Sequence, residues 1–282
     1  MNNQEEIRKV IDVKNVLKQK APGLYRKLPR FIVSYLTRLV HQDELNYILT
    51  HYRDKDGVEF MEALIDYFEL RIKLHGIDNL PPLADKRRFI FASNHPLGGL
   101  DGICLSALLG RHYEGDIRYP VNDLLLFIPN LRSIFVPINK HGTQSKQAVN
   151  LSNEAYASDN QIITFPAGLC SRKQKGKIVD LDWKKSFISK AIEYKRDIVP
   201  IYFEGRNSNF FYNLANLRKQ LGIRANIEML FLSDELFKCK QKTFDIFFGE
   251  PIPWQTFTNG EKPDVWASRI KETVYKLNAN GK

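Results

Sequence analysis

The sequence predicts an α/β protein whose mixed, mostly parallel sheet is flanked by helices, with an N-terminal helical layer. From about residue 86, short apolar runs alternate with longer segments of helical spacing, the pattern of strands that each lead into a covering helix. Residues 1–80 carry helix-period apolar spacing without a convincing strand. We therefore expect an N-terminal helical region, residues 1–80, followed by an α/β domain, residues 81–282.

Three helices are expected within the N-terminal region. Pro22 and Pro29 separate the first two, because proline lacks the backbone N–H of a helical hydrogen bond and interrupts a helix. The apolar positions that define the helices are Ile7, Val10, Ile11 and Val13 for the first, Leu36, Leu39 and Val40 for the second, and Phe60, Leu64, Tyr67, Phe68 and Ile72 for the third.

Seven short apolar runs in the second region are the expected strands. In chain order they are RFIFAS, IRYPV, SIFVPI, QIITFP, IVPIYFE, NIEMLFL and FDIFFGE. The helical candidates between them are GICLSALLGR, SKQAVNLSNEAYA, WKKSFISKAIEYK and FFYNLANLRKQL. Ligands of open α/β sheets bind beyond the carboxyl ends of strands, so polar residues directly after these runs are the candidates for a functional site.

The balance of charge favours an acidic partner. Lys and Arg number 42 against 32 Asp and Glu, which gives a formal net charge of +10. An anionic membrane surface, a phosphorylated substrate, an acidic carrier protein or nucleic acid would each suit that balance. No RNA- or DNA-binding motif is present and the positive charge is not organised as a recognition helix, so no nucleic-acid partner is expected.

The spacing of cysteine and histidine gives no indication of a metal site. Cys104, Cys170 and Cys239 lie far apart, which fits reduced thiols. The first residues, MNNQEEIRKV, are polar, and no apolar run approaches the roughly 20 residues needed to span a bilayer. We expect a cytoplasmic protein, either soluble or peripheral on the inner face of the membrane.

Residues 1–40 are the candidate membrane contact. They hold nine cations and three acids, a net charge of +6, and aromatic residues such as Tyr25, Phe31 and Tyr35 interleave with those cations. Basic amphipathic helices with aromatic residues lie on anionic membrane surfaces. The alternative is a helical layer packed on the α/β domain, with its charges merely solvated.

The stretch NHPLGGLDG, residues 94–102, follows the first expected strand of the α/β domain. One interpretation is a plain turn, because glycine and proline punctuate loops generally. The other is a catalytic pair in which His95 is a general base and Asp101 orients it. Three later strands also end in small-residue turns with a cation, namely NKHGT, AGLCSRK and GRN. Cations and backbone donors on neighbouring loops are typical of a site for an anionic group.

These strand ends resemble a known family. NHPLGGLDG, SIFVPINK, FPAGLCSRK and IVPIYFEG are similar in order and spacing to the four blocks of the glycerolipid acyltransferase superfamily, typified by 1-acylglycerol-3-phosphate O-acyltransferases. The resemblance covers roughly residues 86–206. It implies His95 as the catalytic base and Asp101 as its orienter. The substrate-binding residues that it implies are Lys140 and Arg172 as anion contacts, Gly168 in the binding turn, and Ser171 beside them.

Two departures from the usual blocks bear on the acceptor. Five residues separate His95 from Asp101 where the usual block has four, and Gly98 and Gly99 would let the loop absorb the extra one. This N-H-P-x-G-x-x-D-G form is similar to that of a lysophospholipid acyltransferase-like sub-group, which includes enzymes that acylate amino-acid lipids. Ala167 also stands where the usual third block has glutamate.

The resemblance implies an acyltransferase that moves a fatty acyl chain from acyl-acyl carrier protein or acyl-CoA to the hydroxyl of a lysolipid. The acceptor would be lysophosphatidate-like or a lyso-aminolipid. The thioester is a co-substrate, and no cofactor or metal is required. Two alternatives stay open: an N-acyltransferase that forms an N-acyl amino acid lipid, and a non-catalytic basic protein that binds membrane or nucleic acid.

Overall fold

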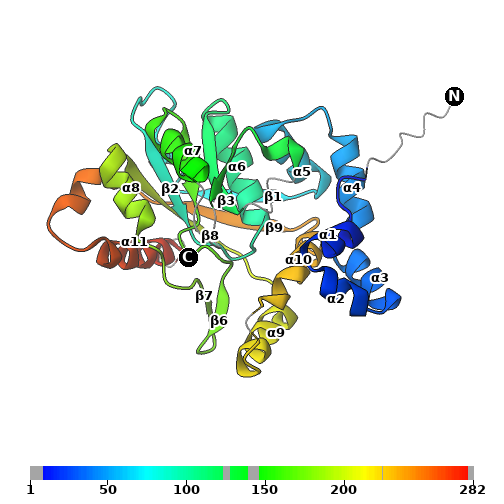
Figure 1. Ribbon diagram of the computed structural model, residues 1–282. Helices are drawn as coiled ribbons and strands as arrows, with labels where there is room; N and C mark the ends of the chain where they lie inside the picture. Colours follow the sequence, from blue (N-terminus) through cyan, green and yellow to red (C-terminus); the bar gives the residue numbers. More distant parts are fainter. Residues whose placement is uncertain (1–8, 123–127, 139–145, 224, 279–282) are drawn as a thin grey trace.

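The centre of the molecule is a seven-stranded sheet. The computed structural model describes residues 9–122, 128–138, 146–223 and 225–278 (Figure 1). The strand order is β1-β9-β8-β2-β5-β3-β4. The strands are β1 (Arg71–His75), β2 (Phe89–Ser93), β3 (Ile117–Asn122), β4 (Phe135–Ile138), β5 (Gln161–Thr164), β8 (Asp197–Phe203) and β9 (Thr243–Phe248).

The direction of pairing makes this sheet mixed and mostly parallel, as predicted. β8 pairs antiparallel with β9, and every other neighbouring pair is parallel. β8, β2 and β5 therefore lie side by side and run in one direction. Because their carboxyl ends share one edge of the sheet, the turns that follow these strands can meet there.

Helices cover both faces of the sheet. Within the described residues they are α1 (Val13–Lys20), α2 (Pro22–Lys27), α3 (Arg30–Leu39), α4 (Gln42–His51), α5 (Gly57–Tyr67), α6 (Leu100–His112), α7 (Lys146–Ala157), α8 (Ser186–Tyr194), α9 (Asn209–Gln220), α10 (Leu232–Phe237) and α11 (Pro263–Leu277). Short 3₁₀ turns lie at η1 (Ile77–Asn79), η3 (Pro129–Leu131), η4 (Ile227–Phe231) and η5 (Trp254–Thr258).

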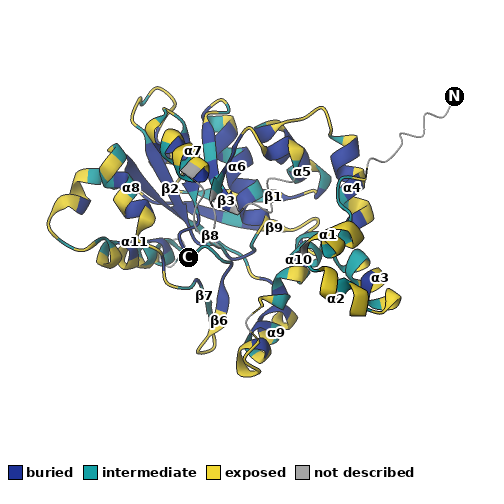
Figure 2. Ribbon diagram, viewed as in Figure 1, coloured by how far each residue is buried: buried dark blue, intermediate teal, exposed yellow. Residues whose placement is uncertain are grey.

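Successive side chains of β2 point to opposite faces of the sheet, and each face has its own hydrophobic core. Phe89 and Phe91 face a core that includes side chains of α5 and α6, whereas Ile90 and Ala92 face a second core with side chains of α7, α8 and α11. All five residues of β2 are buried, as expected for a central strand covered on both faces (Figure 2). The first helices, α1–α3, lie to one side of the sheet and expose most of their residues (Figures 1 and 2).

Two sequence predictions about elements are wrong. Residues 1–80 include a strand, because β1 pairs in parallel with β9 and forms an edge of the sheet. The run NIEMLFL is not a strand but η4 followed by the start of α10. A short apolar run has the same appearance in a buried strand and in a buried helical turn, so periodicity alone could not separate the two.

One unit projects from the sheet, and the sequence predicted its helix α9 but not the hairpin beside it. β6 (Arg172–Gln174) and β7 (Lys177–Val179) form an antiparallel hairpin, and α9 packs beside β6 (Figure 1). We call residues 172–179 together with residues 206–231 the arm. A small separate core holds it together, built around Cys170, Phe211 and Tyr212.

Candidate active site

The turn between β2 and α6 is fixed at its start by Asn94. The side-chain amide of Asn94 donates to the carbonyl of Phe203 at 2.9 Å, and its side-chain oxygen accepts from the N–H of Phe203 at 2.7 Å. This side chain pairs with the end of β8 as a strand residue would. The following residue, His95, therefore leaves the sheet at a defined position between β2 and β8.

His95 and Asp101 form the expected hydrogen-bonded pair. Nδ1 of His95 lies 2.9 Å from Oδ2 of Asp101. The Asp101 side chain is fully buried, and the His95 side chain keeps 14% of its surface exposed. The contact between the two side chains is thus confirmed, and the imidazole keeps a small part of its surface exposed.

Backbone donors hold the carboxylate of Asp101 in its ionised form. Oδ2 accepts the N–H groups of Leu97 at 3.0 Å and Gly98 at 3.4 Å, and Oδ1 accepts the N–H of Gly102 at 3.0 Å. Burial alone would raise the pKa of Asp101, but His95 and these hydrogen bonds hold it below its ordinary value. Asp101 also lies in the first turn of α6, where the helix dipole favours an anion.

Gly98 accommodates the extra residue in the turn. Its φ is +77°, a left-handed conformation that side chains rarely adopt. A Cβ at this position would lie 3.0 Å from Cβ of Cys170 and 3.1 Å from the side chain of Leu232. Gly99 has extended φ and open space around it, so the structure requires glycine at position 98 and not at position 99.

The imidazole of His95 stacks on the ring of Phe165, with centroids 4.2 Å apart. Phe165 comes directly after β5 and contacts the ring of Tyr119 from β3. Within the described part of the chain, Nε2 of His95 has no hydrogen-bond partner. The ring is therefore held on one face and at Nδ1, whereas Nε2 makes no hydrogen bond to the described residues.

Asp180 joins the His95 turn to the turn after β5, and sequence reasoning missed it. Its Oδ1 accepts the backbone N–H of His95 at 3.2 Å and the hydroxyl of Ser171 at 2.6 Å. Its Oδ2 accepts the indole N–H of Trp183 at 2.9 Å. Asp180 is fully buried, and burial raises its pKa although these hydrogen bonds oppose the shift. No local signal could have found this residue, because it lies 85 positions from His95.

Ser171 and Arg172, two of the predicted substrate-binding residues, are buried and have partners within the protein. The Ser171 side chain is buried against Asp180, and its backbone N–H donates to the carbonyl of His95 at 2.7 Å. The Arg172 guanidinium is 3% exposed and pairs with Glu228 at 3.1 Å. Both side chains thus have buried partners within the protein, and their roles as substrate contacts stay predictions.

The two remaining predicted binding residues stay predictions. Lys140 lies outside the described residues. Gly168 follows β5 with φ +70°, and its N–H donates to the carbonyl of Phe165 at 2.9 Å. Gly168 is therefore in a tight turn one strand away from His95, which is compatible with a binding turn.

Cys170 lies under this turn and is unsuited to act as a nucleophile. It is fully buried and accepts from the Arg172 guanidinium at 2.9 Å. Burial raises its pKa to about 11, so the thiol is protonated at neutral pH. Among the described residues, no group of His, Cys, Asp and Glu side chains could hold a metal ion.

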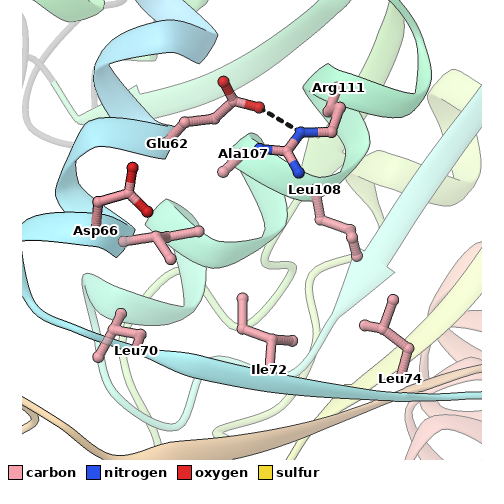
Figure 3. A pocket seen from close by; sticks show the side chains of 9 residues that line it. Glu62, Asp66, Leu70, Ile72, Leu74, Ala107, Leu108 and Arg111 are labelled. Atoms are coloured by element: carbon pink, nitrogen blue, oxygen red, sulfur yellow. Dashed lines mark hydrogen bonds and ion pairs between the residues drawn. The ribbon is translucent and has the colours of Figure 1, made fainter.

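A pocket of about 280 Å³ lies elsewhere, between α5, β1 and the second half of α6 (Figure 3). Leu70, Ile72 and Leu74 form an apolar wall, and the ion pair between Glu62 and Arg111 borders it. No residue of the turn after β2 lines this pocket. The candidate active site around His95 therefore does not coincide with this pocket.

Comparisons with known proteins agree with this chemistry. The sequence profile of the acyltransferase family matches residues 15–272. Two proteins named lyso-glycine lipid O-acyltransferase are similar to this chain: that of Bacteroides thetaiotaomicron is 52% identical and that of Phocaeicola vulgatus 51%. Each comparison covers 95% of this chain, and respectively 97% and 95% of the relative.

Among solved structures, the chain is similar to the 1-acyl-sn-glycerophosphate acyltransferase PlsC of Thermotoga maritima. The identity is 15%, the TM-score is 0.49, and the match covers 87% of this chain and 95% of that one. The family profile spans most of the sequence, and the two relatives are similar along nearly their full lengths. The chain belongs to the acyltransferase family.

Proposed function

We propose that the protein is an O-acyltransferase that moves a fatty acyl group from a carrier thioester to the hydroxyl of a lyso-aminolipid. The observation that carries this proposal is the 2.9 Å hydrogen bond between Nδ1 of His95 and the buried carboxylate of Asp101. A carboxylate on Nδ1 holds the imidazole in the tautomer whose Nε2 can accept a proton.

In the proposed reaction, Nε2 of His95 takes the proton of the acceptor hydroxyl while the hydroxyl oxygen attacks the thioester carbonyl carbon. The carbon–sulfur bond of the tetrahedral intermediate then breaks, and the proton on His95 passes to the departing thiolate. Asp101 stabilises the imidazolium between these two steps. The products are an ester and a free thiol.

The oxyanion of that intermediate needs hydrogen-bond donors. The glycine turn would have been the natural source, but the N–H groups of Leu97, Gly98 and Gly102 are directed at Asp101. These three groups serve to hold the orienting carboxylate. The donor for the oxyanion therefore has to be another group near Nε2 of His95.

The names of the two relatives support lyso-glycine lipid as the acceptor. They specify transfer to oxygen, which favours a hydroxyl over an amine, and this chain shares about half of its residues with both proteins. The departures in the first and third sequence blocks agree with an acceptor other than lysophosphatidate. N-acylation of an amino acid is thus the second candidate function, and the assay described below distinguishes it from O-acylation.

The proposed donor is acyl-acyl carrier protein or acyl-CoA, and the proposed location is the inner face of the cytoplasmic membrane. Both donors are anionic, which suits the net charge of +10. Among the described residues, no helix is both long and apolar enough to cross a bilayer. The exposed aromatic residues Phe31 and Tyr35, on the same helix as exposed Arg30 and Arg38, support peripheral attachment.

The test is an acyl-transfer assay with purified protein, in which both thioester donors are combined with three acceptors. The acceptors are lyso-glycine lipid, lysophosphatidate and free glycine, and the products are identified by mass spectrometry. We expect an ester of the first acceptor. An inactive His95→Ala variant, prepared in the same way and shown to be folded, is the control for contaminating enzymes.

Each other outcome contradicts a defined part of the proposal. A preference for lysophosphatidate would contradict the acceptor, and an amide product from glycine would contradict transfer to oxygen. Absence of any product from folded protein with both donors would contradict the enzymatic role itself.

A further inference from the structure

The arm, residues 172–179 and 206–231, has an apolar row on α9 that is largely exposed, although Phe210 at its start contacts the ring of Phe231. The buried face of α9 includes Phe211, Ala215 and Arg218. A second row of apolar residues, with the helical spacing of four, three and four positions, lies on another face of the same helix. That row is Phe210, Leu214, Leu217 and Leu221.

Exposure shows that this second row faces solvent. Leu221 is 64% exposed, Phe210 53% and Leu217 51%, and Ile223 and Leu230 beside them are exposed as well. Five of the thirteen exposed large apolar side chains among the described residues thus lie on the arm. The solvent face of a helix in a globular protein is ordinarily polar, so this concentration points to an apolar partner.

The exposed charges on the described part of the arm are all positive. Residues 172–179 and 206–227 contain no Asp or Glu. The one acid of the arm, Glu228, is fully buried between Arg172 and Arg218. The exposed charged residues of the arm that the structure describes are Lys173, Lys175, Lys177, Arg206 and Lys219.

The arm starts at the candidate active site. Ser171, directly before β6, donates its N–H to the carbonyl of His95, and Asn207, before α9, donates to the carbonyl of Pro96 at 3.4 Å. From that root, α9 with its 12 residues extends about 18 Å away from the sheet (Figures 1 and 2). Whatever the end of the arm binds is therefore held at a short, fixed distance from His95.

We propose that the arm is a lipid-docking element, which inserts its apolar row into the interface of an anionic bilayer while its cations contact the head groups. This surface lies on other elements than the contact proposed at α3, and it rests on the proposed function only in that a lipid acceptor resides in the bilayer. Apolar insertion combined with cations on the same element is the chemistry of interfacial membrane binding. An acidic carrier protein would need the cations but would not account for five exposed apolar side chains.

The test is flotation of the full-length protein with vesicles of phosphatidylcholine alone and of phosphatidylcholine mixed with phosphatidylglycerol. One variant carries Leu217→Ser and Leu221→Ser, and a second carries Lys173→Glu, Lys175→Glu and Lys177→Glu. Matched controls change equal numbers of exposed residues outside the arm. These are Leu83→Ser with Val265→Ser, and Lys86→Glu with Lys262→Glu and Lys276→Glu.

We expect each arm variant to reduce partition onto anionic vesicles at least roughly fivefold, because each basic residue near an anionic surface contributes about that factor and burial of a leucine side chain contributes at least as much. The matched controls should change partition less than about twofold, and circular dichroism should show all variants folded. Activity on an acceptor dispersed in detergent should be retained by the arm variants, and activity on an acceptor embedded in anionic vesicles should fall.

A smaller reduction, or an equal reduction in the matched controls, would overturn the proposal. Unchanged vesicle binding with slower turnover of acyl-acyl carrier protein would also overturn it, in favour of a carrier-binding surface. Flotation needs no enzymatic activity, so failure of the proposed function, with no acyl transfer in any assay, would remain distinguishable from failure of the docking role.

Discussion

Nδ1 of His95 lies 2.9 Å from Oδ2 of Asp101, and the carboxylate receives further hydrogen bonds from Leu97 and Gly102. If His95 is the general base, His95→Ala should lower kcat by about 10²–10⁴-fold, because general-base catalysis contributes that much. Asp101→Asn should reduce kcat as well, since an amide neither fixes the tautomer nor stabilises the imidazolium. Initial rates with saturating acceptor check both expectations.

His112 offers a control for the loss of a histidine. His112 is the last residue of α6, at the opposite end of the helix from Asp101. It is partly buried, and its Nε2 contacts the carbonyl of Pro81. His112→Ala should leave kcat within a few-fold of the unmodified protein. Comparable losses in the His95 and His112 variants would contradict a catalytic role for His95.

Gly98 should tolerate substitution far less than its neighbour. Gly98→Ser imposes a side chain on a residue with φ +77° and against Cys170, which should reduce the free energy of unfolding by at least about 1–2 kcal/mol. Gly99→Ser should have little effect or stabilise slightly, because Gly99 is the N-cap of α6 and serine is favoured there. Urea unfolding of the two variants measures the difference, and equal losses would contradict the structural explanation of the longer turn.

Arg172 should contribute to stability more than to acceptor binding. Arg172→Ala leaves the carboxylate of Glu228 buried with only Arg218 as a charged partner, and breaking such a pair typically costs about 3–5 kcal/mol. Arg206→Ala, at an exposed position, should change the free energy of unfolding by less than about 0.5 kcal/mol. A stable Arg172→Ala variant with a raised KM for the acceptor would instead restore the anion contact suggested by the sequence.

Asp180 should make the stability of the protein depend on pH. Burial raises its pKa in the folded state, so the native protein binds this proton more tightly than the unfolded chain does. The resulting stability is fully present below the unfolded pKa and is lost as pH rises through the higher folded pKa. The free energy of unfolding relative to that of Asp180→Asn should therefore decline from about pH 4 upward.

A matched variant separates this charge effect from the loss of a contact. Trp183→Phe removes the indole N–H that donates to Asp180 together with part of a buried ring, so it should lower stability. The pH dependence should remain or become larger, because that hydrogen bond opposes the rise in the pKa of Asp180. If Asp180→Asn shows the same pH dependence as the unmodified protein between about pH 4 and pH 7, another group must carry it.

The sequence was most informative where the site is local in the chain. His95 and Asp101 share one turn after a buried strand, so their contact could be predicted from seven consecutive residues. The burial of Arg172 could not be predicted, because a cation at a strand end suggests exposure, whereas Glu228, its buried partner, lies 56 positions away. Asp180 was missed for the same reason of distance. β1 was missed because a short half-buried edge strand that directly follows α5 fits the helical spacing of that helix.

The pairing of β1 with β9 has a consequence for synthesis. Arg71 is aligned with Thr243, so at translation rates of about 5–20 residues per second the edge strand waits about 10–35 s for its partner to be made. During that interval the backbone donors and acceptors of β1 have no strand to pair with, and unpaired strands are prone to associate with other chains. Completion of the sheet is thus a late event in synthesis, because β1 cannot pair before β9 has been made.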